Sequence, residues 1–498
     1  MITDLSTKRA QLSPNRVAFH DVESDESITY AQFDRRASQA ATVLAEQGIE
    51  AGDRIVILCR NRVEFFETLF ACGKLGAILV PLNWRMPSGE LAGLIEDCHP
   101  KLLITGEEDR ANGTAAIEGT SIHHLDLETD YALARDRAAP HTGRPVWPDD
   151  ETWYLIYTSG TTGKPKGVIQ TYRMAVVNYV NIGQAIGLRG GDHTLNFLPL
   201  FHTAGINLHT LPVFMAGGTN HILPGFEPGP MLKLIDAGEL DVFIGVPACY
   251  RGLIQHEDFE KTDLTKLRHW ACGGAPLPDI LVETFAKHGA IVCNGMGMTE
   301  TGPTVFLVDE DRALEKIGSV GKPQILVNAR VADDDNNPLP AGETGELQFQ
   351  GPGLTPGYWE REEETAKLFT EDGWLKSGDL ARYDEDGYWF IAGRLKEMYI
   401  SGGENVYPAE VENILDEHPA VLESAVAGVA DEKWGEVGCA HILLRPNKTA
   451  SEDELRDWCR ERLAAYKVPK YVVFAYDLPR TAAGKVQKHL LPVPEVAQ

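Results

Sequence analysis

One short segment of the chain carries the residue types that bind phosphate. Residues 157–167 read YTSGTTGKPKG, in which glycines alternate with hydroxyl side chains and lysines stand at Lys164 and Lys166. Glycines let backbone N–H groups approach an anion, hydroxyls add hydrogen-bond donors and lysines add positive charge. An apolar run at residues 153–157, typical of a buried strand, leads into the segment. This pattern favours a phosphate-binding loop over the alternative, a flexible surface turn rich in glycine and threonine.

The spacing of this loop differs from that of the common P-loop. The motif G-x-x-x-x-G-K-[ST] would require glycine at position 158 and serine or threonine at position 165. The chain has Thr158 and Pro165 at those positions. We therefore expect phosphate binding in an enzyme that is not a P-loop NTPase.

Three further segments carry polar side chains suited to a nucleotide. Residues 294–300 (NGMGMTE) end in a hydroxyl beside a carboxylate, which suits a phosphate oxygen and a hard cation such as Mg²⁺. Residues 377–379 (SGD) place a carboxylate after a tight turn, where it could accept ribose hydroxyls. Residues 479–485 (PRTAAGK) place Lys485 on a glycine-containing loop, from which it could offset transition-state charge. Each also has a plainer interpretation: a helix N-terminus, a turn cap and a solvated lysine.

Length, charge and cysteine content narrow the class of protein. A chain of 498 residues with 43% hydrophobic side chains indicates two or more domains with a large core. The net charge of −27 argues against a nucleic-acid-binding protein, because phosphates would be repelled. No apolar stretch is long enough to span a bilayer, and the eight scattered cysteines lack C-x-x-C spacing. We therefore expect a cytoplasmic protein with reduced thiols and no membrane span.

Alternating strand and helix patterns predict parallel sheets covered by helices. In the first part of the chain, strands are expected at residues 54–59, 77–82 and 101–105, with a helix at 64–74. The pattern recurs with strands at 241–246, 267–272 and 290–294, a helix that begins at Pro247 and a helix at 277–288. This order is typical of α/β layers.

The pattern changes at about residue 318. Short strands are then separated by turn clusters at 333–338, 341–345 and 384–387, which predicts an antiparallel β-subdomain. From about residue 397 helices and strands resume, with Pro408 at the start of one helix and a capping box of Ser451 and Glu454 at another. This last part predicts a separate, small α+β domain.

Together and in this order, the four motifs resemble those of the adenylate-forming (ANL) superfamily: acyl-CoA synthetases, adenylation domains of nonribosomal peptide synthetases and firefly-type luciferases. The resemblance spans nearly the whole chain, from residues 28–30 to Lys485. It implies an N-terminal AMP-binding domain at 1–393, a hinge at 394–396 and a mobile C-terminal domain at 397–498. It also implies an ATP- and Mg²⁺-dependent ligase that forms an acyl-adenylate, which a thiol then attacks.

The resemblance further implies a role for each motif residue. The β- and γ-phosphates would be held by Thr158, Ser159, Gly160, Thr161, Thr162, Gly163 and Lys166. Adenine would contact Gly274, Ala275, Pro276, Met296, Gly297 and Met298, and the ribose would contact Asp379 and Arg394. Thr299 would contact the α-phosphate, Glu300 would bind Mg²⁺ and Lys485 would bridge the carboxylate and the α-phosphate. Rotation of the small domain would then exchange Lys485 for residues 402–404.

Two positions depart from the pattern usual in the family. Met296 stands where relatives usually have an aromatic residue that stacks on adenine, and a methionine thioether can also cover a ring. The hinge residue is Lys396, where many relatives have aspartate and others have lysine. Neither departure argues against catalysis.

Another group of residues bears on the identity of the acid. Residues 198–202 (LPLFH) resemble the segment that gates the acyl pocket, so we assign His202 to the pocket rather than to a purely structural hydrogen bond. Phe243 stands where amino-acid-activating relatives place an aspartate for the substrate amine, although Asp241 is nearby. A roomy, apolar cavity would be left by Gly295, Gly297 and Gly302. We expect an apolar monocarboxylate, either an aryl acid such as a hydroxycinnamate (ferulate) or a medium-chain fatty acid.

The resemblance of residues 66–83 to bacterial feruloyl-CoA and acyl-CoA synthetases favours the aryl acid. Because only a short tail follows Lys485, we expect free coenzyme A as the thiol rather than a fused carrier domain. Trp434 would face the CoA, or else pack in the core of the small domain. Three alternatives stay open: an adenylation enzyme that loads a separate carrier protein, a luciferase-like oxygenase and a non-catalytic nucleotide-binding protein. The oligomeric state is also open, with a homodimer among the options.

Overall fold

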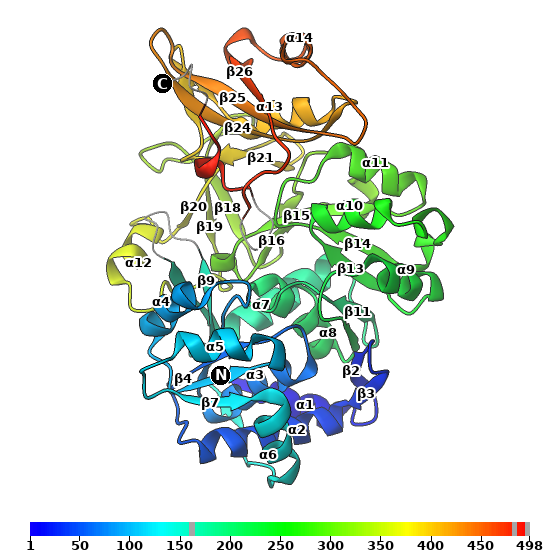
Figure 1. The fold of residues 1–498 in the computed structure, drawn as a ribbon, viewed down its shortest axis with the longest axis vertical. Coiled ribbons are helices and arrows are strands. Elements are labelled where there is room, and N and C mark those ends of the chain that lie inside the picture. Colours follow the sequence, from blue (N-terminus) through cyan, green and yellow to red (C-terminus); the bar gives the residue numbers. More distant parts are fainter. Residues whose placement is uncertain (159–164, 481–485, 494–498) are drawn as a thin grey trace.

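The computed structural model describes residues 1–158, 165–480 and 486–493. Helix-covered sheets form the lower part of the molecule, and the antiparallel strands β18–β21 lie between them and the C-terminal sheet at the top (Figure 1). The predicted fold class, a large N-terminal α/β part with a β-subdomain and a small C-terminal α+β part, is confirmed.

The first sheet contains the strand that leads into the predicted phosphate loop. Its order is β10-β9-β5-β4-β6-β7. The bounds are β4 (Arg54–Leu58), β5 (Ile78–Pro81), β6 (Leu102–Thr105), β7 (His123–Asp126), β9 (Thr152–Thr158) and β10 (Lys166–Thr171). All neighbours are parallel except β9 and β10, which pair antiparallel with Thr158 opposite Lys166. The loop therefore connects two antiparallel strands, whereas a P-loop connects a strand to a helix.

Six helices accompany this sheet, of which the apolar α3 contacts β5 and β9 directly. They are α1 (Leu5–Leu12), α2 (Tyr30–Glu46), α3 (Val63–Leu75), α4 (Ser88–Cys98), α5 (Arg110–Ala116) and α6 (Ala132–Arg137). A capping box of Thr29 and Gln32 starts α2, and Gly76 with φ +83° ends α3. The core beneath them is aromatic: the Phe70 ring centre lies 5.4 Å from that of Trp153.

The second sheet carries the other predicted α/β layer. Its order is β13 (Val242–Gly245), β14 (His269–Cys272), β15 (Val292–Gly297), β16 (Thr304–Leu307) and β17 (Lys322–Pro323). The first three strands are parallel, and α9 (Pro228–Ala237), α10 (Pro247–Gln255) and α11 (Asp279–Lys287) accompany them. The predicted strands and helices are confirmed, including Pro247 in the first turn of α10.

A small sheet and two helices complete the N-terminal part. The sheet has the order β11 (His193–Asn196), β12 (Thr219–Ile222), β2 (Val17–Asp21) and β3 (Glu26–Thr29). Helix α7 (Tyr172–Ala185) follows β10 directly and contacts β16, and α8 (Thr210–Ala216) contacts β11. A short two-stranded sheet joins β1 (Ile2–Thr3) to β8 (Val146–Trp147).

The predicted antiparallel β-subdomain is confirmed. It consists of β18 (Asn328–Ala332), β19 (Gly345–Gln350), β20 (Leu375–Tyr383) and β21 (Trp389–Arg394), with α12 (Glu362–Leu368) between β19 and β20. The turn at residues 333–338 is stabilised by one carboxylate. Asp333 accepts hydrogen bonds from the backbone N–H groups of Asp335 (3.0 Å) and Asn337 (2.8 Å).

The C-terminal part has one sheet and two helices. The strands are β22 (Tyr399–Ser401), β23 (Glu404–Val406), β24 (Val421–Asp431), β25 (Gly435–Leu444) and β26 (Tyr471–Phe474), and the helices are α13 (Pro408–Asp416) and α14 (Glu452–Arg460). Pro408 is the first residue of α13, and the predicted capping box of α14 is present.

The cysteine prediction is confirmed, because all eight cysteines are buried and unpaired. Among the described residues, no helix has both the length and the hydropathy that crossing a bilayer requires.

Candidate active site

The strand after the predicted phosphate loop lies beside the turn η6 (Thr299–Thr301). Gln170 on β10 donates a hydrogen bond from Nε2 to the carbonyl of Thr299 (2.9 Å). Thr355 joins the two segments, since its N–H donates to the carbonyl of Glu300 (2.8 Å) and its hydroxyl donates to a carbonyl of β10 (2.7 Å). Segments predicted to contact the γ- and α-phosphates are therefore adjacent.

Tyr358, which belongs to none of the sequence motifs, links Glu300 to Lys166. Its hydroxyl donates to Oε1 of Glu300 (3.0 Å), and Nζ of Lys166 lies 5.0 Å from its ring centre. Burial, and secondly the adjacent Glu300 carboxylate, raise the pKa of Tyr358 well above its ordinary value. The phenol therefore stays protonated and holds the buried Glu300 carboxylate in place.

A Mg²⁺ ion fits this arrangement. In enzymes that act on nucleotides, Mg²⁺ is usually bound by one or two carboxylates together with substrate phosphates. Glu300 would supply one such oxygen ligand, with its orientation fixed by the hydrogen bond from Tyr358. Within the described ranges, no three His, Cys, Asp or Glu side chains converge on a metal site, so the remaining ligands would come from the nucleotide and water.

Asp379 and Arg394 meet across two neighbouring strands. They lie opposite each other on β20 and β21, and Nε of Arg394 is 2.8 Å from Oδ1 of Asp379. The separate tight turn predicted before Asp379 is wrong, because Gly378 lies inside β20 with φ +69°, where the pairing with β19 shifts register. A strand kink therefore directs the Asp379 carboxylate, which is mostly buried beside the half-exposed guanidinium.

The residues predicted to contact adenine lie at the carboxyl ends of two neighbouring parallel strands. Residues 274–276 form an exposed turn after β14, and Gly274 has φ +82°. A Cβ at Gly273 would lie 3.2 Å from the carbonyl oxygen of Gly295, so this turn passes close to β15. Met296 and Met298 are half-buried against the core of the β-subdomain. Their contact with adenine stays a prediction.

The prediction that Gly295, Gly297 and Gly302 leave a roomy cavity is wrong. A Cβ at Gly297 would lie 1.5 Å from the carbonyl oxygen of Pro303, and one at Gly295 would lie 2.8 Å from that of Phe306. A Cβ at Gly302 would also come within 2.9 Å of a carbonyl oxygen. These glycines are needed because backbone segments pack closely around β15 and β16.

His202 lies in a half-buried turn between β11 and α8. Its N–H donates to the carbonyl of Pro199 (3.1 Å), and its own carbonyl accepts from the N–H of Gly205 (3.1 Å). A Cβ at Gly205 would lie 2.4 Å from the carbonyl oxygen of Leu198, so only glycine fits there. The turn fixes the position of His202, and its role in the acyl pocket stays a prediction.

A cluster of cations and aromatic rings beside His202 was missed from the sequence. The His202 ring centre lies 4.7 Å from that of Phe201, whose ring is 6.3 Å from Trp84. The guanidinium groups of Arg60 and Arg85 lie 3.1 and 4.4 Å from the centre of the Trp84 ring. These residues follow the ends of β4 and β5, and since parallel strands end at the same edge, the predicted sheet could have indicated them.

The two residues considered for binding a substrate amine have structural roles instead. Phe243 is fully buried and stacks on Phe197, with ring centres 5.5 Å apart and planes at 15°. The Asp241 carboxylate accepts a hydrogen bond from the backbone N–H of His193 (2.9 Å). Neither side chain therefore presents a carboxylate to a substrate ammonium group.

Several predicted site residues, namely Ser159, Gly160, Thr161, Thr162, Gly163 and Lys485, lie outside the described residues. The residues that flank them are described. Thr158 pairs with Lys166, and Arg480 forms an antiparallel bridge with Val486.

In the C-terminal part, Gly402 and Gly403 form the turn of the β22–β23 hairpin, with φ +62° and +91°. Trp434 packs over Gly402, and a Cβ there would lie 2.9 Å from its ring. Because Trp434 is 48% exposed, it is not part of the core of this domain, and its contact with CoA stays a prediction.

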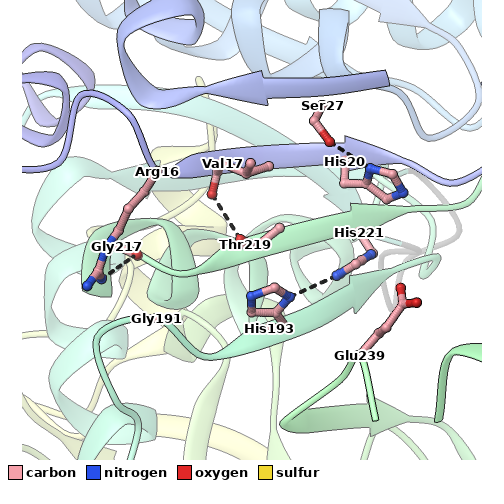
Figure 2. Close-up of a pocket in the computed structure, with 10 residues that line it drawn as sticks. All are labelled: Arg16, Val17, His20, Ser27, Gly191, His193, Gly217, Thr219, His221 and Glu239. Atoms are coloured by element: carbon pink, nitrogen blue, oxygen red, sulfur yellow. Dashed lines mark hydrogen bonds between the residues drawn. The ribbon is translucent and has the colours of Figure 1, made fainter. Parts of the chain in front are cut away.

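A hollow of about 550 Å³ lies on the small sheet, away from every predicted site residue. Figure 2 shows His193 and His221 on adjacent strands, with Nδ1 of His193 3.0 Å from Nε2 of His221. Burial, and secondly the neighbouring histidines, lower the pKa of His221 to about 3, so it is neutral at physiological pH. Because none of the predicted site residues lines this hollow, we do not assign it to catalysis.

Comparison with known proteins identifies the class of the chain. The AMP-binding enzyme family matches residues 6–359, and the AMP-binding enzyme C-terminal domain matches residues 410–485. The chain belongs to this family. It is an AMP-forming acyl-CoA synthetase, which uses ATP, Mg²⁺ and coenzyme A to join a carboxylic acid to CoA, and the predicted membership of the adenylate-forming superfamily is confirmed.

Relatives and solved structures cover almost the whole chain. A feruloyl-CoA synthase from Amycolatopsis sp is 40% identical over 481 residues, which cover 97% of this chain and 96% of the relative. The long-chain-fatty-acid–CoA ligase FadD13 of Mycobacterium tuberculosis is 36% identical over 492 residues, with the same coverage. The structure of o-succinylbenzoate CoA synthetase from Bacillus subtilis with its acyl-adenylate is 32% identical, has a TM-score of 0.90, and aligns with 99% of this chain and 98% of its own.

Proposed function

We propose that this acyl-CoA synthetase activates an apolar monocarboxylate, with an aryl acid such as ferulate or another hydroxycinnamate preferred over a medium-chain fatty acid. The observation that carries the proposal is the lining around His202. Ala204 and Leu208 are half-buried apolar side chains on the same segment, and the half-buried Val246 packs against the same hydrophobic cluster. Phe243 stacks on another ring in the core, and the Asp241 carboxylate accepts a hydrogen bond from a backbone N–H. Neither side chain would therefore bind the amine of an amino-acid substrate.

The similarity to named relatives supports the same preference for an aryl acid over a fatty acid. A feruloyl-CoA synthase is 40% identical to this chain, and a long-chain fatty-acid ligase is 36% identical. Backbone fills the space beside Gly295, Gly297 and Gly302, so the pocket that we propose does not depend on empty space around β15. It depends on the segment 202–208, in which His202, Ala204 and Leu208 are half-buried.

In the proposed mechanism, the carboxylate attacks the α-phosphate without a general base, because a carboxylate is already ionised at neutral pH. The main obstacle is repulsion between anions, so positioning and electrostatic stabilisation supply most of the catalysis. Lys166 and Lys485 would offset the charge of the phosphates and of the attacking carboxylate. Glu300 would hold Mg²⁺, which neutralises the departing pyrophosphate.

We propose that the remaining motif residues orient the nucleotide. The Asp379 carboxylate would accept ribose hydroxyls, while the ion pair with Arg394 holds it in position. Residues 274–276 and 296–298 would border the adenine from two adjacent strand ends. The segment 158–163 would hold the β- and γ-phosphates, with Thr299 at the α-phosphate.

Free coenzyme A is the proposed thiol. Arg60 and Arg85 lie against Trp84 beside the His202 turn, and their positive charge suits the phosphates of CoA. The half-exposed Trp434 would face CoA after the small domain, residues 397–498, rotates about the hinge at 394–396. Lys396 at this hinge is exposed and lies between β21 and β22, outside regular secondary structure.

The testing experiment is a pyrophosphate-release screen over aryl, medium-chain and dicarboxylic acids, with free CoA present. We expect hydroxycinnamates to give the highest kcat/KM, octanoate and decanoate to give a lower one, and succinate to give none. A dicarboxylic or amino acid as the best substrate would refute the apolar pocket.

Product analysis in the same screen separates the alternatives. We expect a CoA thioester in amounts equal to the pyrophosphate released. Pyrophosphate release without thioester would favour an adenylation enzyme that loads a separate carrier protein, and light emission with a luciferin would favour a luciferase-like oxygenase.

A further inference from the structure

One face of α7 is fixed against the turn that carries the proposed Mg²⁺ ligand. Met174 and Asn178 are four residues apart on α7, and this spacing places their side chains on the same face of the helix. A Cβ at Gly302, the residue after the turn η6, would come within 3.3 Å of the Met174 side chain. Gln170 donates to the carbonyl of Thr299 (2.9 Å), and Oδ1 of Asn178 accepts from the N–H of Thr304 (3.3 Å). Strand β10 is thus bonded to the start of this turn, and helix α7 is bonded to β16, the strand that follows the turn.

The same asparagine also contacts the segment that carries His202. Nδ2 of Asn178 donates to the carbonyl of Asn207, which lies in η3 (Ala204–Leu208). Nδ2 of Asn207 in turn donates to the carbonyl of Gly302 (2.6 Å). Both asparagine side chains are buried, with exposed fractions of 2% and 0%. Two side chains therefore close a three-way junction between α7, η3 and the turn η6.

The other end of the His202 segment is held by similar bonds. Nδ2 of Asn196 donates to the carbonyl of Gly205 (2.7 Å), and its Oδ1 accepts from Asn61 (2.8 Å). Buried, hydrogen-bonded amides resist displacement, because breaking one bond leaves a polar group unsatisfied in a medium of low dielectric. The segment is therefore rigid relative to both sheets.

We propose that Asn178 and Asn207 are positioning residues for adenylate formation. They hold the segment around His202 at a fixed separation from η6, so that the acid carboxylate and the α-phosphate meet in line. The inference rests on the roles proposed above for His202 and Glu300. Neither asparagine needs to touch a substrate, since each acts through the backbone of the segments that do.

The test compares Asn178→Ala with Asn181→Ala in the full-length enzyme. Asn181 lies on the same helix and is also 2% exposed, but its Oδ1 accepts from the N–H of Leu326 (3.0 Å), toward the β-subdomain. We expect Asn178→Ala to lower the kcat of acid-dependent pyrophosphate release on the order of 100-fold, because small misplacements of reacting groups have effects of this size. Both variants should lose similar thermal stability, and Asn181→Ala should keep its kcat within about threefold.

A double-mutant cycle sharpens the comparison. Because Asn178 and Asn207 act in one junction, the variant with both changed to alanine should lose little more kcat than either single variant. Should Asn178→Ala fail to fold, Asn178→Asp keeps the volume and the acceptor toward Thr304 but loses the donor to Asn207, and carries the same expectation. Equal losses of kcat in the Asn178 and Asn181 variants, or an unchanged kcat in the former, would overturn the inference.

The assays use whichever acid supports the highest wild-type rate, so a wrong substrate class leaves the comparison intact. The metal role proposed for Glu300 is tested by a separate experiment. That role is refuted if Glu300→Gln leaves the Mg²⁺ dependence of pyrophosphate release unchanged. The positioning role is tested only by the difference in kcat between the Asn178 and Asn181 variants.

Discussion

At the scale of single residues, Glu300 is the proposed protein ligand of Mg²⁺, on which adenylation would depend. Glu300→Gln keeps the shape of the side chain and an oxygen that can accept from Tyr358. It removes the negative charge that Mg²⁺ requires, so we expect the Mg²⁺ concentration for half-maximal adenylation to rise by at least about tenfold. Pyrophosphate release as a function of Mg²⁺ measures it. Glu310→Gln, an exposed carboxylate on the same part of the chain, should change nothing, and an unaltered Mg²⁺ dependence in Glu300→Gln would remove Glu300 from the metal site.

Tyr358→Phe tests the orientation of that ligand. The variant deletes only the hydroxyl that donates to Oε1 of Glu300. Loss of a hydrogen bond to a metal-binding carboxylate typically weakens metal affinity by roughly 10–100-fold. We expect Mg²⁺ saturation to shift in the same direction as in Glu300→Gln, with the KM for the acid unchanged. A change in the KM for the acid alone would show that Tyr358 serves the pocket instead.

The sequence could predict most of the described site residues but not Tyr358. Glu300, Asp379 and Arg394 lie in motifs whose residue types suit a nucleotide, and the structure pairs Asp379 with Arg394 as one unit. Tyr358 has no motif around it, and it reaches Glu300 only because it bridges to Val168 on β10. A contact of this kind depends on tertiary packing between distant segments, which local pattern does not encode.

At the scale of elements, helix α13 carries a carboxylate with a strongly altered environment. Burial, and then the neighbouring Glu412 and Glu423, raise the pKa of Asp416 to about 7. Its Oδ1 has no hydrogen-bond partner among the described residues. The folded state therefore holds a proton that the unfolded state releases above about pH 4, and stability is lost as pH rises from about 4 through 7.

Asp416→Asn should remove this pH dependence. We expect the variant to melt near the wild-type temperature at pH 5 and several degrees higher at pH 8, on the order of 5 °C. Asp453→Asn, which changes a carboxylate on α14 that is 86% exposed, should show no such growing difference, because this side chain is surrounded by water in the folded and in the unfolded state. The measurement is thermal unfolding between pH 5 and 8, and a constant or reversed difference for Asp416→Asn would contradict the assignment.

Strands whose positions depend on the hydrophobic pattern were predicted well. Glycines whose role depends on contacts with neighbouring backbone were predicted poorly. The strands β4, β5, β13 and β14 follow from short apolar runs. The glycines of β15 were interpreted as cavity, yet each is required because a carbonyl oxygen stands where a Cβ would be. A glycine-rich segment has the same composition whether it borders a cavity or packs against backbone. Only the position of the opposing strand distinguishes these two situations.

At the scale of the whole molecule, the order of sheets and the change of pattern near residue 394 were readable from the sequence, but the acid was not. The proposed acyl pocket would draw side chains from several elements, because His202 and Ala204 precede α8 whereas Val246 precedes α10. The reaction class follows from motifs that contact the shared nucleotide. The substrate follows from residues that vary with the acid, and it therefore needs the screen described above.

The central claim is that one chain performs two half-reactions, with Lys485 needed only for the first. The most direct test measures both half-reactions in Lys485→Ala. Pyrophosphate release from ATP and the acid should be lost, while thioester formation from a supplied acyl-adenylate and CoA should continue near the wild-type rate. An equal loss of both half-reactions would contradict the exchange of Lys485 for residues 402–404 by domain rotation.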